Sequence, residues 1–169
     1  TDFIGRIWYQ RTIDIPADWS GRNVMLNFGA VYYTSEVYVD GRFVGRHFGG
    51  STSFSYDITA FVKPGGSHSL VVFATSDLRS GKQTAGKQSL QYASLSCDYT
   101  RTTGIWQTVW VEFVPKSYIK SIKLFPTPES SSVAFSCELC GSGELGIDVL
   151  YEGKLVGRYD CKNAAGCVS

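Results

Sequence analysis

Residues 36–45 read Glu-Val-Tyr-Val-Asp-Gly-Arg-Phe-Val-Gly, and this stretch is the strongest local signal for the class of fold. Two runs of β-branched and aromatic residues flank the pair Asp40-Gly41. Both central residues of a type I′ turn have a positive φ, a conformation that Asp and Gly adopt more readily than most residues. The stretch therefore predicts a tight β-hairpin.

Strand patterns extend from this hairpin in both directions. Residues 7–15 (IWYQRTIDI) and 23–28 (NVMLNF) alternate between two sets of side chains, as the two faces of a sheet require. Residues 69–75 (SLVVFAT) are apolar on both parities, which predicts a strand covered on both faces. Residues 105–113 (IWQTVWVEF) predict another central strand. Because no window of a dozen residues has a helical period, the sequence predicts an all-β sandwich or jelly roll.

A domain boundary is predicted close to Pro115, where the last of these strands ends. Four further short strands are predicted at residues 118–125, 132–139, 146–151 and 154–159. An immunoglobulin-like sandwich takes about seven strands, so this second part is expected to be incomplete. The predicted domains are residues 1–116 and a partial second β domain at residues 117–169.

The charge balance argues against two classes of partner. Sixteen basic and fifteen acidic residues give a net charge of +1, which offers no electrostatic attraction to nucleic acid or to an anionic membrane. The longest apolar runs are too short to span a bilayer, and no signal-peptide pattern opens the chain. We therefore expect neither nucleic acid nor a membrane as a partner.

The sequence contains no recognisable catalytic or metal-binding motif. Its two histidines, His47 and His68, are not accompanied by a nucleophile elbow, a phosphate-binding loop or a zinc-protease motif. The five cysteines are Cys97, Cys137, Cys140, Cys161 and Cys167. A zinc site is disfavoured because Cys137 and Cys140 would point to opposite faces of a strand. The alternatives are one or two disulfides if the protein is exported, and reduced thiols if it is not. No metal and no organic cofactor is predicted.

The connection between residues 76 and 104 is the most informative segment for function. It is long, polar and aperiodic, and such loops between central strands are uncommon and usually functional, disordered or docked against another domain. Its side chains suit hydrogen bonding and stacking on a sugar; the residues in question are Asp77, Arg79, Lys82, Lys87, Gln88, Tyr92, Tyr99 and Arg101. The alternative interpretation is a solvated loop.

Several blocks together resemble the N-terminal sugar-binding domain of glycoside hydrolase family two. They are Trp8-Tyr9-Gln10-Arg11-Thr12, Gly49-Gly50 with Phe54, Asp57-Ile58-Thr59, and residues 103–110, TGIWQTVW. The resemblance covers about residues 5–118, and the remainder is similar to the start of that family's immunoglobulin-like second domain. The GIWQTVW form is most similar to bacterial members labelled β-galactosidase.

The resemblance implies a jelly-roll, galactose-binding-like β-sandwich followed by a partial immunoglobulin-like β-sandwich. It further implies a place in a larger O-glycosyl hydrolase that hydrolyses β-galactoside-like substrates by a retaining mechanism. The catalytic (β/α)₈ barrel of that enzyme, which would be this chain's partner, is absent here, and the strand that precedes the Trp-Tyr block is expected to be missing. By itself the chain is therefore expected to be inactive. A periplasmic or secreted bacterial location is expected.

Three site residues are carried over by the resemblance. Asp77 matches an aspartate that reaches toward the catalytic barrel and contacts the sugar, and Lys87 and Gln88 match a Gly-Lys-Gln block. Asp77 could instead be a turn residue that bonds its own backbone. Trp106 and Trp110 are expected to pack in the core or against a neighbouring domain.

Two other functions remain open at this point. One is an autonomous carbohydrate-binding module without hydrolase activity, which would use an aromatic platform on a sheet face or in loops. The other is a structural β-sandwich that makes only protein contacts.

Overall fold

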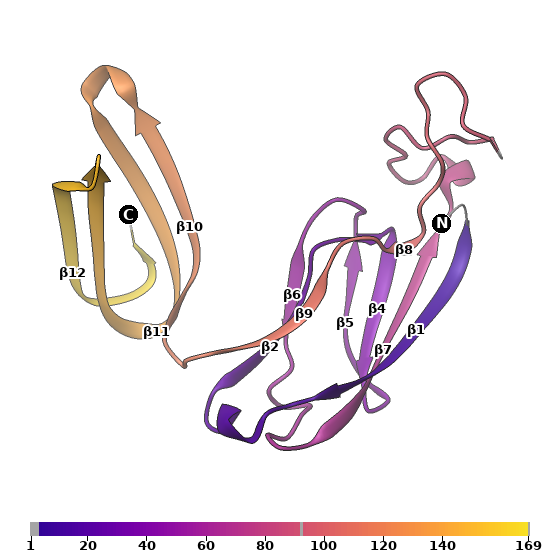
Figure 1. The fold of residues 1–169 in the computed structure, drawn as a ribbon, viewed down its shortest axis with the longest axis horizontal. Coiled ribbons are helices and arrows are strands. Elements are labelled where there is room, and N and C mark those ends of the chain that lie inside the picture. Colours follow the sequence, from indigo (N-terminus) through magenta and orange to yellow (C-terminus); the bar gives the residue numbers. More distant parts are fainter. Residues whose placement is uncertain (1–3, 92, 169) are drawn as a thin grey trace. The chain divides into compact units, whose positions relative to one another are not determined.

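The chain folds into two compact units, residues 1–113 and residues 114–169. A computed structural model describes residues 4–91 and 93–168, except for the side chains of Asn163 and Cys167. Figure 1 shows strands in both units. Among the described residues, three single-turn 3₁₀ segments connect strands. In the described residues no helix is long and apolar enough to span a membrane.

The first unit is a sandwich of two main sheets. Within residues 4–91 and 93–114 the larger sheet has the order β1 (Gly5–Asp14), β7 (Ser67–Ser76), β4 (Thr34–Val39) and β5 (Arg42–Phe48), and its pairs are antiparallel. The smaller sheet has the order β6 (Phe54–Asp57), β2 (Asn23–Phe28) and β9 (Val109–Val114). A short ladder joins β3 (Val31–Tyr32) to β8 (Gly104–Ile105), and the 3₁₀ turns η1 (Ala17–Trp19) and η2 (Leu78–Ser80) follow β1 and β7. The predicted all-β sandwich is confirmed.

The core lies between these sheets and follows the predicted alternation. In β2 the side chains of Val24, Leu26 and Phe28 are buried, and Leu70 and Val72 of β7 are buried with them in the same cluster. Burying such side chains contributes about 1.5–3 kcal/mol each, so this cluster is the main source of stability.

The prediction that β7 is covered on both faces is wrong for its outer face. Val71 and Phe73 are only half-buried there, because no second layer of the described residues covers them. Phe73 is sheltered instead by Trp8 on the adjacent strand, whose ring centroid lies 4.6 Å away. A run that is apolar on both parities can therefore have one of its faces shielded only by cross-strand neighbours.

The predicted hairpin is present between β4 and β5. Asp40 and Gly41 have φ values of 49° and 74°, the two positive angles that a type I′ turn needs. The turn is also bonded to the neighbouring strand, since Asp40 Oδ2 lies 2.6 Å from His68 Nδ1 and Asp40 Oδ1 accepts the Ser69 N–H at 2.8 Å. His68 Nε2 accepts the Lys63 N–H at 2.9 Å, so the ring hydrogen is on Nδ1 and donates to Asp40.

The second unit is a meander, described here through residue 168. Its strands β10 (Tyr118–Thr127), β11 (Ser132–Tyr151) and β12 (Lys154–Val168) pair in that order, and η3 (Pro128–Ser130) joins the first two. The prediction of four strands is wrong, because residues 132–139 and 146–151 belong to one strand. Gly141, with a φ of 76°, lies where the register of β11 shifts, so the glycine-rich stretch forms an irregularity within a strand instead of a turn.

Candidate functional site

The segment between β7 and β8 has its own hydrogen-bonded structure. The Tyr99 N–H donates to the Lys87 carbonyl at 2.7 Å, and the Ser89 N–H donates to the Tyr99 carbonyl at 2.8 Å. The Thr102 N–H donates to Gln88 Oε1 at 2.6 Å. These bonds join the two arms of the segment to each other at the end of the sandwich where β7 finishes (Figure 1). Most residues of the segment are nevertheless exposed, so the alternative of a solvated loop is not contradicted.

A pocket of about 380 Å³, called here the loop pocket, lies between this segment and the sandwich. It is built from β3, from the turn after β5, from both arms of the segment and from the residue that follows β8. Its described lining residues are Tyr32, Gly50, Ser51, Thr84, Ala85, Gly86, Lys87, Gln88, Tyr99, Thr102 and Trp106.

Aromatic rings form the walls of the loop pocket. Trp106 is 48% exposed and Tyr99 is 63% exposed, so their rings are accessible. The Trp106 indole N–H donates to the Gly50 carbonyl at 2.7 Å, which fixes the orientation of the ring. Trp106 therefore does not pack in the core of this chain, because its indole N–H needs a partner and finds it at the surface turn. The other alternative, packing against a neighbouring domain, stays a prediction.

Gly50 also controls the position of Tyr32. A Cβ atom added at Gly50 would lie 1.9 Å from Tyr32 Cδ2, so the ring packs directly against the glycine backbone. The Tyr32 hydroxyl donates to the Thr84 carbonyl. Burial raises the pKa of Tyr32, while the side chains of Gln83 and Gln88 oppose this shift, and the hydroxyl is a neutral donor at physiological pH.

The structure places two of the three predicted site residues in this pocket. Lys87 and Gln88 line it, and Asp77 does not. Asp77 is exposed at the start of η2; its N–H donates to Gln83 Oε1 at 2.9 Å, and Gln83 Nε2 donates to Ser76 Oγ at 3.1 Å. The Asp77 carbonyl accepts the Ser80 N–H at 3.2 Å, so Asp77 is a turn residue, but its carboxylate makes no capping bond to η2.

Other candidates in the same segment lie elsewhere. Arg101 is only 2% exposed and is thus a buried structural residue. Arg79 donates through Nε to the Leu90 carbonyl at 3.3 Å. Tyr92, another candidate in this segment, lies outside the described residues.

Sequence reasoning missed the parts of the pocket that come from outside the segment. Tyr32 and Ser51 carry no sequence signal that would connect them to residues 84–88. Gly50 belongs to a Gly-Gly pair that the resemblance includes, and Thr102 precedes one of its blocks, so these two could have been found. Their proximity depends on β3 and the end of β5 meeting β8, which is a long-range pairing.

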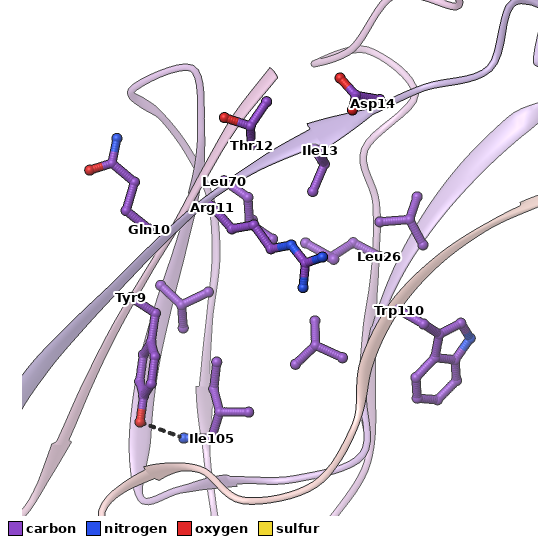
Figure 2. Close-up of a pocket in the computed structure, with 13 residues that line it drawn as sticks. Tyr9, Gln10, Arg11, Thr12, Ile13, Asp14, Leu26, Leu70, Ile105 and Trp110 are labelled. Carbon is purple, nitrogen blue, oxygen red and sulfur yellow. Dashed lines mark hydrogen bonds between the residues drawn. The ribbon is translucent and has the colours of Figure 1, made fainter. Parts of the chain in front are cut away.

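A larger hollow of about 690 Å³ opens between the edge strands β1 and β9 (Figure 2). Its floor consists of core side chains, Leu26, Leu70 and Val72, and Figure 2 shows Arg11 extending into it. The Ile105 N–H donates to the Tyr9 hydroxyl at 3.2 Å on one side. The lining combines this apolar floor with polar side chains from β1, namely Gln10, Arg11, Thr12 and Asp14.

Trp110 lies on the border of that hollow and is 43% exposed, so it does not pack in the core of this chain. Packing against a neighbouring domain, the other alternative for Trp110, stays a prediction. It comes from an outward-facing position of β9, where the described sandwich has no further layer to bury it.

The remaining polar groups do not assemble a metal centre. Among the described side chains no group of three or more His, Cys, Asp or Glu residues could bind a metal ion. Cys97, Cys137, Cys140 and Cys161 are free thiols, and the side chain of Cys167 lies outside the described set. His47 stacks on Phe54 with ring centroids 3.9 Å apart, and burial lowers its pKa.

Known proteins similar to this chain are glycosidases. A β-galactosidase of Thermoanaerobacter pseudethanolicus is 31% identical over 127 residues, which are 75% of this chain and 16% of that enzyme. A β-glucuronidase of Paenibacillus borealis is 41% identical over 64 residues, 38% of this chain and 11% of that enzyme. The chain thus spans less than a fifth of the length of either relative.

Two solved structures share the fold over nearly the whole chain. A β-D-glucuronidase from Dictyoglomus thermophilum has a TM-score of 0.70 at 24% identity, covering 99% of this chain and 31% of that one. A β-glucuronidase from Ruminococcus gnavus has a TM-score of 0.71 at 22% identity, covering 99% of this chain and 31% of that one. Residues 2–115 match the family model of the glycosyl hydrolases family 2 sugar binding domain, and the chain therefore belongs to glycosyl hydrolase family 2.

Proposed function

We propose that this chain is the non-catalytic sugar-binding portion of a β-glycosidase. Its loop pocket would shape the rim of the active site, and its first unit would brace a catalytic barrel that belongs to the rest of a longer protein. The proposal is supported by the family and by the small share of each relative that the chain spans. Hydrolysis of O-glycosyl bonds, with a β-galactoside-like substrate, would be the activity of the whole enzyme.

The observation that carries this proposal is the composition of the loop pocket. Tyr99 and Trp106 offer accessible aromatic surfaces, on which the C–H face of a sugar ring can stack, and the buried Tyr32 ring lies behind them in the wall. Lys87 and Gln88 line the same pocket, and ammonium and carboxamide groups bond sugar hydroxyls. A few polar groups among aromatic walls are typical of a small-ligand site.

The same pocket is unsuited to breaking a glycosidic bond. A retaining glycosidase needs two carboxyl groups about 5–5.5 Å apart, one as nucleophile and one as acid and base. The described lining residues of the loop pocket include neither Asp nor Glu. The two carboxyl groups would therefore have to come from the catalytic barrel.

An autonomous carbohydrate-binding module is the second candidate, and one feature favours it. The outer face of the larger sheet carries cross-strand neighbours that are aromatic, with Trp8 beside Phe73 and Tyr38 beside Phe43. Exposed aromatic side chains on a sheet face can bind a glycan without a second domain.

Two measurements on the purified chain separate these functions. Incubation with a nitrophenyl β-galactoside should release no nitrophenol, and release by a preparation free of contaminating enzyme would refute the non-catalytic assignment. Isothermal titration with galactosides should give millimolar or undetectable affinity for a rim segment. A micromolar dissociation constant would favour the autonomous module.

The coding sequence beside these residues provides an independent test. The proposal requires a barrel domain with a catalytic glutamate after an asparagine, as the family resemblance implies. A longer protein without such a domain would leave the module as the better assignment.

A further inference from the structure

The turn that follows β5 supplies one wall of the loop pocket. Residues 49–53 connect β5 to β6, and Gly50 and Ser51 of this turn line the pocket. The Gly50 carbonyl accepts the Trp106 indole N–H, so the position of the turn determines how an exposed ring of the pocket is oriented. A residue that holds the turn in place therefore also preserves the shape of the pocket.

His47, the second-last residue of β5, contacts both the turn and the strand that follows it. Its Nε2 lies 3.3 Å from Thr52 Oγ1. Its ring stacks on Phe54, the first residue of β6, with centroids 3.9 Å apart and planes inclined by 11°. The imidazole thus connects the two ends of the turn on either side of the residues that line the pocket.

The other ring nitrogen of His47 faces an uncharged interior. Among the described residues, the buried Nδ1 has no hydrogen-bond partner. Ser35, opposite His47 on β4, is fully buried, and its hydroxyl has no partner either. The ionisable group that β6 adds on this side is Tyr56, which packs over Gly45 of β5. Burial raises the pKa of Tyr56, so its hydroxyl is neutral.

The charged neighbours of His47 lie on the opposite face of the sheet. Glu36 and Arg46 occupy partnered positions of β4 and β5 and bond each other, with Arg46 Nε donating to Glu36 Oε1 at 3.0 Å. Burial is accordingly the cause that lowers the pKa of His47. A protonated imidazole carries an N–H on both nitrogens, so protonation would place a charge and an unpaired donor at Nδ1. Because both are costly to bury, a protonated ring is expected to turn toward solvent and to leave Thr52 and Phe54.

We propose that His47 is a positioning residue of the loop pocket: its neutral ring holds the turn at residues 49–53, and protonation releases the turn together with the hydrogen bond between Gly50 and Trp106. The pocket would then be formed at neutral pH and open in mild acid. The consequence for a ligand rests on the proposed function, since it assumes that the pocket contacts sugar, whereas the change in the shape of the pocket does not.

The indole N–H of Trp106 tests this change without any ligand. The ¹⁵N-labelled chain is titrated from about pH 8 to about pH 5, the range in which an imidazole changes its charge, and its NMR signals are followed. The absence of one indole signal from the spectrum of Trp106→Phe identifies the signal of Trp106. We expect this signal to move toward the position of an exposed indole as the pH falls. Its midpoint should equal that of the His47 ring signals and lie below the ordinary histidine pKa of 6.5. Amide signals of β2 verify that the sandwich stays folded.

Substitutions of the two histidines separate titration from packing. His47→Phe keeps a flat ring on Phe54 but cannot be protonated, and His47→Gln is uncharged but still polar, so in both the Trp106 signal should no longer move with pH. His68→Gln is the matched control, because His68 is the other histidine of the sequence and lies 2.6 Å from Asp40 at the turn of the β4–β5 hairpin. It should leave the pH response unchanged.

The contact between His47 and Thr52 has its own pair of variants. Thr52→Val removes the hydroxyl beside Nε2, so the Trp106 signal should already lie closer to the exposed position at neutral pH. Thr52→Ser keeps a hydroxyl at this site and should behave like the native chain.

Each remaining outcome overturns a defined part of the proposal. A Trp106 signal that stays constant while His47 titrates overturns the coupling between them, and a signal that still moves in His47→Phe and His47→Gln overturns the role of His47. A His47 ring that stays neutral throughout the titration overturns the release of the turn. None of these results concerns sugar binding, which the titration with galactosides tests separately.

Discussion

At the scale of single residues, Gly50 has the most influence on the shape of the loop pocket. Its backbone packs against the Tyr32 ring and its carbonyl accepts the Trp106 indole N–H. One residue without a side chain thus positions two of the three aromatic walls.

Replacing Gly50 by alanine should disrupt both contacts. The new Cβ would lie 1.9 Å from Tyr32 Cδ2, so the ring must move or the backbone must shift. We expect a loss of about 1–3 kcal/mol in the free energy of unfolding, as for other overpacked sites, together with loss of sugar-induced shifts. Urea denaturation measures the first effect and NMR titration the second.

Gly143→Ala provides a matched control, because a Cβ at Gly143 meets nothing within 4 Å. If Gly50→Ala were as stable as this control and still bound sugar, the close packing of Tyr32 on Gly50 would have no structural importance.

Asp77 is the residue whose predicted role concerns the longer protein. Its exposed carboxylate is not used to cap η2, and so it is available to accept hydroxyl hydrogen bonds from a substrate. In a β-glycosidase that contains this chain, Asp77→Ala should lower kcat/KM about tenfold to a thousandfold, if one transition-state hydrogen bond is lost. Steady-state kinetics on the full-length enzyme would measure this, and unchanged kinetics would remove Asp77 from the active site.

At the scale of elements, the β4–β5 hairpin is connected to β7 through one carboxylate. The hydrogen bond from His68 lowers the pKa of Asp40, and the Ser69 N–H acts in the same direction. A carboxyl group whose pKa is lower in the folded state stabilises the fold at pH values above its unfolded pKa, and that contribution disappears as the pH falls through the folded pKa.

This linkage predicts that the difference in the free energy of unfolding between the native chain and Asp40→Asn depends on pH. Asparagine tolerates the positive φ of the turn but carries no charge. The native chain should therefore be the more stable of the two above the ordinary Asp pKa of 3.8, and its advantage should shrink as the pH falls below that value. Urea midpoints between neutral and acidic pH would show this, whereas a constant difference would contradict the linkage.

Local patterns predicted the hairpin and the main strands of the first unit, but they divided β11 into two strands. Long-range contacts produced what these patterns could not predict. The burial of Val24, Leu26 and Phe28 depends only on which face of their own strand is covered. It could therefore be predicted from the alternation in the sequence. The meeting of Tyr32, Gly50 and Trp106 depends on which strands lie side by side, information that no local pattern contains. Lys87 and Gln88 came from a family resemblance, and the structure adds the aromatic walls around them.

At the scale of the whole molecule, the first unit has an open edge between β1 and β9. Arg11 occupies an inward-facing position of β1, in the series of Ile7, Tyr9 and Ile13, yet it is exposed in the hollow of Figure 2. A charged side chain at an inward position of an edge strand is one way in which natural sheets oppose pairing with other chains.

Replacing Arg11 by leucine should therefore increase self-association. The substitution makes the hollow continuously apolar beside a strand edge, which favours contact between copies of the chain. Light scattering across a concentration series should show a larger mean mass for Arg11→Leu than for the native chain. Arg11→Lys keeps the charge and should behave like the native chain, and an unchanged mass for the leucine variant would exclude a protective role.

The duplicated Gly-Lys-Gln tripeptide gives this chain an internal reference for chemical footprinting. Lys82 and Lys87 have the same immediate neighbours in sequence. An amine-reactive label added to the free chain would therefore modify both lysines in the same solution. A bound molecule that covers the pocket would shield Lys87 alone. The ratio of the two modified peptides in mass spectrometry would therefore report occupancy independently of protein concentration or reagent dose, even within a crude extract.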